Sequence, residues 1–184
     1  MNGTVLVAYA TRYGSTHEVA DAVAARLRGQ GLAVEVKPLK ELRSLEGCQA
    51  LVLGAPFYMG SLLKEARAFL ERQRTALEQM PVALFALGPT SANDDLDGAL
   101  AQLDGTLQKM PWLRPVASAM FVGAYDPAKL RLADKLVAAL PASPLHGLGP
   151  HDDRDWDAID AWADGLAGAL GAASGPTPGV APRT

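Results

Sequence analysis

Six consecutive residues after the first apolar segment carry hydroxyl groups and a glycine at a spacing that suits an anion. These residues are Thr11, Arg12, Tyr13, Gly14, Ser15 and Thr16. A helix is expected to begin at Ser15, and the free amide groups of a first helical turn favour a negative charge. Hydroxyls beside these amides can hold a phosphate dianion without a cation. The alternative is that Ser15 or Thr16 only caps the helix.

Two further loops hold candidate binding residues, because each follows a continuously apolar segment. The second loop contains Ala55, Pro56, Phe57, Tyr58, Met59 and Gly60. The third loop contains Gly88, Pro89, Thr90 and Ser91. The alternatives are that the aromatic pair of the second loop belongs to the core, and that the third loop is a turn built by Gly-Pro and Ser-Ala-Asn.

Strand-like and helical patterns alternate along the chain. Strands are expected at residues 4–10, 33–39, 48–56, 81–88 and 114–123, and helices at residues 15–28, 62–77, 96–107 and 153–170. This alternation indicates an α/β protein with a parallel sheet. Five such strands favour a flavodoxin-like, three-layer, doubly wound sheet of order 2-1-3-4-5. Ligands of this architecture bind beyond the carboxyl ends of the strands, so the three loops are expected to lie together.

Two segments carry a resemblance to a known family. The Thr-x-x-Gly-x-Thr pattern of residues 11–16 resembles the phosphate loop of flavodoxins. The stretch LGAPFYMGSLLKEA, residues 53–66, resembles a branch of flavodoxin-domain proteins that includes the menaquinone-dependent, oxygen-independent protoporphyrinogen oxidase. The resemblance implies FMN as the cofactor, bound by the residues of the three loops. The flavin would carry the chemistry, so no catalytic side chain and no metal are expected.

The chemistry of the second and third loops agrees with a flavin. An oxidised isoalloxazine ring is flat and apolar and favours an aromatic or apolar partner, for which Phe57, Tyr58 and Met59 are candidates. Gly60 permits a peptide orientation that other residues resist, and a backbone group there could bond the flavin N5. The resemblance places the third loop at the pyrimidine edge, where amides of Gly88, Thr90 and Ser91 would face the ring carbonyls.

A long segment, residues 124–152, separates the fifth strand from the last helix and exceeds an ordinary connection. It contains a short helical pattern at residues 130–140, and the protoporphyrinogen oxidase relatives resemble this arrangement. We expect it to form a wall for a partner or substrate beside the flavin, outside the core. Residues 1–171 are then one FMN-binding domain with this insertion, and the Gly/Pro/Ala-rich residues 172–184 are a flexible tail.

Composition limits the functional classes. The 184 residues are 49% hydrophobic and 20% charged with a net charge of −3, which does not favour nucleic-acid binding. One cysteine, Cys48, fits a reducing compartment. Strand-like sequence from Thr4 leaves no room for a signal peptide, and no apolar run reaches the roughly 18 residues of a membrane span. These features predict a cytoplasmic protein without a transmembrane segment.

Three functions remain open. The first is an FMN-dependent oxidoreductase, with protoporphyrinogen and a quinone as the candidate donor and acceptor. The second is a non-catalytic, flavodoxin-type electron carrier between protein partners, and the third is a scaffold that binds no flavin. The phosphate loop argues against the third, and the insertion favours the first. The expected partners are a redox protein or a quinone and a porphyrin-like substrate, with peripheral membrane contact or a homodimer as further options.

Overall fold

The structure is a computed structural model that describes residues 3–88, 95–141, 143, 146–147 and 149–172. Its centre is a parallel sheet of order β2-β1-β3-β5-β6. The strands are β1 (Thr4–Tyr9), β2 (Val34–Pro38), β3 (Cys48–Tyr58), β5 (Val82–Leu87) and β6 (Ala117–Phe121). When these five strands are numbered one to five by their order along the chain, their order in the sheet is 2-1-3-4-5, as predicted. This confirms the flavodoxin-like α/β fold.

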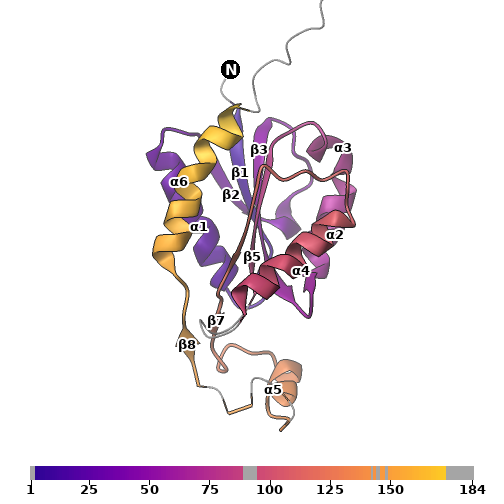
Figure 1. The fold of residues 1–184 in the computed structure, drawn as a ribbon, viewed down its shortest axis with the longest axis vertical. Helices are drawn as coiled ribbons and strands as arrows, with labels where there is room; N and C mark the ends of the chain where they lie inside the picture. Colours follow the sequence, from indigo (N-terminus) through magenta and orange to yellow (C-terminus); the bar gives the residue numbers. More distant parts are fainter. Residues whose placement is uncertain (1–2, 89–94, 142, 144–145, 148, 173–184) are drawn as a thin grey trace, which may run out of the picture.

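Helices cover both faces of the sheet (Figure 1). Helices α1 (Ser15–Gly29) and α6 (Trp156–Ala172) pack on one face. Helices α2 (Lys64–Arg72), α3 (Arg74–Leu77) and α4 (Leu96–Gln108) lie on the other, and a short 3₁₀ helix (Leu39–Glu41) follows β2. Because successive strand residues point to opposite faces, a strand buried on both sides is apolar throughout. In β1, Val5 and Val7 enter one core and Leu6 and Ala8 the other.

The structure corrects the predicted boundaries around the second loop. The third strand continues past Pro56 to Tyr58 and turns into β4 (Ser61–Leu62), which pairs with it in antiparallel fashion. The helix predicted over residues 62–77 therefore begins at Lys64, because Leu62 pairs with Phe57. It is also interrupted at Gln73, whose φ of −99° and ψ of 10° lie outside the helical range.

The insertion forms a unit with its own small core. It contains β7 (Ala124–Tyr125), α5 (Leu132–Ala138) and β8 (His151–Asp152), and β7 and β8 pair as a separate two-stranded sheet. Figure 1 shows α5 beyond the end of the sheet that is opposite to the N-terminus, where the strands have their carboxyl ends. Tyr125, Leu130 and Ala138 are buried together, with Tyr13 of the first loop packed against them. The insertion therefore meets the main domain at the predicted phosphate loop.

Candidate functional site

The first loop leads into α1 without a side-chain cap. Gly14 is the N-cap residue, with a φ of 99°, and no side chain accepts a hydrogen bond from the first-turn amides. The positive φ explains the glycine, because few other residues adopt it at low cost. Thr11 Oγ1 accepts a hydrogen bond from the Gly14 amide at 2.9 Å and so fixes the bend of the loop. The alternative that Ser15 or Thr16 caps the helix is wrong.

Thr16 has the environment expected of an anion ligand. Its side chain is 0% exposed, and Oγ1 has no hydrogen-bond partner within the described part of the chain. A buried, unpaired hydroxyl is costly, so such a group indicates a missing partner. A phosphate at the start of α1 would accept hydrogen bonds from this hydroxyl and from the uncapped first-turn amides. The residues present therefore fit the phosphate group of FMN.

The second loop is a tight hairpin that exposes two side chains. Met59 and Gly60 have φ values of 50° and 72°, as in the two-residue turn that joins twisted antiparallel strands. Tyr58 is 41% exposed and Met59 fully exposed, whereas Phe57 is 5% exposed and belongs to the core. A positive φ is unusual for methionine and marks a strained position. Tyr58 and Met59 are thus free to contact a ring, and the buried place of Phe57 favours the core alternative for its side chain.

The other residues predicted in the second and third loops are less accessible. Ala55 and Pro56 are buried in β3. The Gly88 amide donates to the Phe121 carbonyl at 3.1 Å, so this amide is engaged in the sheet and does not serve a flavin carbonyl. Pro89, Thr90 and Ser91 lie outside the described residues.

The insertion is bound to the first loop by a carboxylate. Asp134 of α5 accepts a hydrogen bond from the Tyr13 hydroxyl, and its other oxygen lies 3.4 Å from the Arg12 guanidinium. Burial and the hydrogen bond to Asp134 raise the pKa of Tyr13 to about 12. Burial also raises the pKa of Tyr58, although part of its side chain is exposed, and the charges of Arg12 and Asp134 act on it in opposite directions. The first loop, the second loop and α5 therefore meet at one place.

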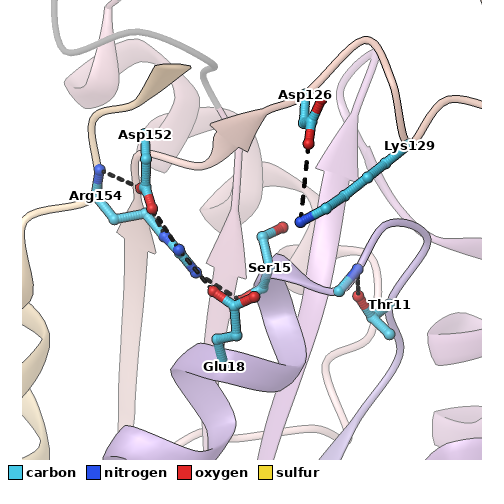
Figure 2. A network of polar contacts seen from close by, with 8 residues as sticks. Thr11, Ser15, Glu18, Asp126, Lys129, Asp152 and Arg154 are labelled. Carbon is cyan, nitrogen blue, oxygen red and sulfur yellow. Dashed lines mark hydrogen bonds and ion pairs between the residues drawn. The ribbon is translucent and has the colours of Figure 1, made fainter. Parts of the chain in front are cut away.

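Arg154, in the segment that leads from β8 to α6, holds the C-terminal end of the insertion against α1 (Figure 2). Its side chain is 6% exposed and donates to Glu18 at 2.7 Å, to Asp152 and to the Ser15 carbonyl at 3.3 Å. The hydrogen bond from Arg154 lowers the pKa of Asp152. A buried guanidinium that is shared by two carboxylates and a carbonyl is a fixed structural contact. It ties the C-terminal end of the insertion to the start of α1.

A pocket of about 300 Å³ lies between the start of α1 and the insertion. Ser15 and Glu18 line it on the helix side, and Tyr125, Asp126 and Lys129 line it on the insertion side. Sequence reasoning did not identify Asp134, Lys129 or Arg154 as neighbours of the loop. Their distance along the chain from residues 11–16 exceeds one hundred residues, and no local pattern reports such a contact.

The fold and this loop define a flavodoxin-like flavoprotein. The family described as "Flavodoxin domain" matches residues 6–147, which is most of the chain. The chain therefore belongs to the flavodoxin-domain family, and this membership indicates FMN as the cofactor and electron transfer as the activity. No curated protein matches the chain by sequence.

Solved structures support the fold. A flavodoxin from the domain Archaea is 12% identical with a TM-score of 0.57, over 91% of this chain and 99% of that one. A cysteine-to-serine mutant of the flavodoxin from Pseudomonas aeruginosa is 19% identical with a TM-score of 0.56, over the same shares. Rubredoxin oxygen:oxidoreductase from Desulfovibrio gigas is 17% identical with a TM-score of 0.54, over 92% of this chain and 36% of that chain. At these identities the likeness concerns the fold alone.

Two features are absent from the described residues. No group of three or more His, Cys, Asp or Glu side chains there is arranged to hold a metal ion. In the same residues, no helix combines the length and the apolar character needed to cross a membrane.

Proposed function

We propose that the protein is an FMN-dependent oxidoreductase whose insertion borders the flavin and selects an electron donor or acceptor. The observation that carries the proposal is the attachment of the insertion to the phosphate loop through Asp134, Tyr13 and Arg12. A protein that only carries electrons between partners has no evident need for such a structure beside its cofactor. The simple carrier is the alternative.

Each part of the site has a separate task in this proposal. The Thr16 hydroxyl and the first-turn amides hold the phosphate, and Gly14 lets the backbone turn around it. Tyr58 and Met59, whose side chains are exposed, would lie against the ring. FMN supplies the redox chemistry, and the chain binds and orients it and limits the access of water.

The insertion offers an apolar surface for the second reactant. Leu132 and Leu136 are 77% and 66% exposed and four residues apart in α5, so they lie on one side of this helix. Leu140, just beyond the end of α5, is 56% exposed. Exposed apolar side chains that cluster in this way are typical of a binding surface. An apolar acceptor such as a quinone, and a ring-shaped donor such as protoporphyrinogen, are the candidates that we propose. A redox protein, a membrane surface or a second copy of the chain would also suit an apolar surface.

A turnover assay separates the oxidoreductase from the carrier. The FMN-loaded protein is mixed with protoporphyrinogen or other donors and with quinones, and product is measured over many turnovers. An oxidoreductase oxidises a small-molecule donor repeatedly, at a rate that depends on the acceptor concentration. A carrier is reduced once and needs a protein partner to continue. Absence of turnover with every small-molecule pair, together with fast oxidation by a redox protein, would favour the carrier.

A further inference from the structure

Two adjoining hollows lie along α2, which covers the face of the sheet opposite to α1 and α6 (Figure 1). Their volumes are about 510 and 320 Å³, and Glu65 and Ala68 line both of them, so the two are continuous. Thr11 and Arg12 of the first loop line the larger hollow. This surface therefore begins at the loop proposed to hold the FMN phosphate and extends from there along α2.

Cations predominate among the charged side chains that line the two hollows. They are Arg12, Lys64 and Arg131 in the larger hollow and Lys40, Arg43 and Arg72 in the smaller one. Glu65 is the only carboxylate of the described chain that lines either hollow, and Glu41 lines a further hollow that adjoins both. The whole chain has a net charge of −3, so these six cations form a basic surface on an acidic molecule.

Most of the positive charge of this basic surface is not neutralised within the molecule. Arg12 is paired with Asp134 at 3.4 Å. The other five cations are exposed, and no carboxylate of the described residues lies within ion-pair distance of their charged groups. Like charges that gather without counter-charges repel each other, so this arrangement disfavours the free protein and favours an anionic partner.

We propose that the basic surface is the docking site of an acidic redox protein that exchanges electrons with the bound flavin. Complementary charges would speed the encounter and would orient the partner toward the first loop. The inference rests on the electron-transfer part of the proposed function. It applies to an oxidoreductase and to a simple carrier alike, because both exchange electrons.

The shape of the surface favours a folded protein over other anionic partners. The cations surround two hollows, which can receive acidic side chains that protrude from a partner. A flat anionic membrane would instead meet the protruding parts of the molecule. The net charge of −3 disfavours nucleic acid, whose binding depends on a basic protein surface and is opposed by the remaining acidic surface.

The salt dependence of electron transfer tests the proposal, because the local charge and the net charge predict opposite signs. The FMN-loaded protein is mixed in a stopped-flow instrument with a reduced, acidic two-iron ferredoxin as the probe. One electron passes from the iron–sulfur cluster, which is oxidised, to the bound flavin, which is reduced. We expect the second-order rate constant to fall as salt is added, since salt screens the attraction. A rate constant that rises with salt would show repulsion by the net negative charge and would overturn the proposal.

A charge-reversed double variant, Lys64→Glu with Arg131→Glu, should slow this reaction roughly three- to tenfold at low salt. The matched control is Lys109→Glu with Arg114→Glu, which changes the net charge equally. Both control residues are exposed and lie between α4 and β6, outside the basic surface. The control should stay near the wild type, and equal slowing in the two double variants would contradict the docking site. Circular dichroism checks the fold, and the salt dependence of the wild type decides independently of all variants.

A binding measurement does not depend on electron transfer. The full chain, labelled with ¹⁵N and studied with and without FMN, is titrated with the oxidised ferredoxin and followed by NMR. The amide signals that shift or broaden should gather at Lys40, Arg43, Lys64, Arg72 and Arg131. Changes confined to other surfaces would overturn the proposal, as would a response of these amides to phosphatidylglycerol vesicles or to a single-stranded oligonucleotide but not to ferredoxin. A chain that binds ferredoxin here but no FMN would contradict the proposed function and not the docking surface.

Discussion

At the scale of single residues, Thr16 is the group whose environment is hardest to explain without a cofactor. Its side chain is fully buried in the first turn of α1, yet its hydroxyl has no partner in the described chain. Folding thus leaves this hydroxyl unsatisfied at a cost of about 1–3 kcal/mol. The cost is offset if a phosphate accepts the hydrogen bond. Thr16 would therefore stabilise the FMN-bound protein and slightly lower the stability of the protein without FMN.

Replacing Thr16 with valine, which has nearly the same shape, should therefore act in opposite directions on stability and binding. The free energy of unfolding of the apo protein should rise by about 1 kcal/mol, because an unpaired hydroxyl is removed. FMN should bind roughly ten- to a hundredfold more weakly, since a hydrogen bond to a charged group is lost, while riboflavin changes little. Urea unfolding and flavin titration measure the two effects. Thr75→Val, at an exposed site on α3, is the control. Equal loss of both flavins would mean that Thr16 acts through the fold alone.

Tyr13 gives a prediction for alkaline pH. Its pKa is raised from 10.0 to about 12 in the folded protein, chiefly by burial and by the hydrogen bond to Asp134. Between these values the unfolded chain loses the tyrosine proton and the folded chain keeps it, so ionisation favours the unfolded state. The stabilising contribution of Tyr13 is fully present below pH 10 and is lost as pH rises toward 12.

The measurement is urea unfolding of the wild type and of Tyr13→Phe across this pH range. The difference in free energy of unfolding between the two proteins should shrink as pH rises through the window. Tyr9 and Tyr58, whose pKa values are also raised, are present in both proteins and cancel in the comparison. Curves that remain parallel across the whole window would contradict the link between Tyr13 and Asp134.

At the scale of elements, the insertion is distinct from the main domain in packing but tied to it in two places. Its buried side chains form a cluster separate from both cores of the sheet. Asp134 attaches α5 to the first loop, and Arg154 attaches the chain after β8 to α1. Such an element can be removed without exposing the main core, which makes its contribution measurable.

Replacing residues 124–150 with a short Gly/Ser linker should leave the fold intact and FMN bound. Turnover with the physiological donor or acceptor, or self-association, should be lost.

A double variant, Leu132→Ser with Leu136→Ser, keeps the insertion in place and should lose the same activity while retaining FMN. Circular dichroism, flavin titration and sedimentation provide the readouts. If the linker variant does not fold, the segment is core; if it keeps full activity and the same oligomeric state, the proposed role is wrong.

Local sequence patterns predicted the sheet and its helices because burial on both faces leaves continuous apolar strands such as residues 50–53. They did not show the break at Gln73 or the hairpin at Met59, since neither position holds a residue that requires the observed backbone. The phosphate loop was predicted from its glycine and hydroxyls. The contact between Asp134 and Tyr13 was not, because 121 residues separate them and only the fold brings them together.

At the scale of the whole molecule, the sheet order brings the carboxyl ends of β1, β3 and β5 together, and the insertion starts at the same end of the sheet. This is the switch point at which doubly wound sheets bind ligands. The site therefore follows from the topology, and the family match over residues 6–147 indicates which ligand it takes. We propose that the insertion selects the particular donor and acceptor and so decides the reaction.

The most direct test of this account is identification of the flavin that the protein holds. Purified protein, reconstituted with excess FMN where needed, is freed of unbound flavin and then denatured, and the released compound is identified by chromatography. We expect a yellow protein that releases FMN, intact and in equimolar amount, because no covalent attachment is predicted and the buried Thr16 hydroxyl and first-turn amides are placed for a terminal phosphate. Release of no flavin after reconstitution would contradict the central claim.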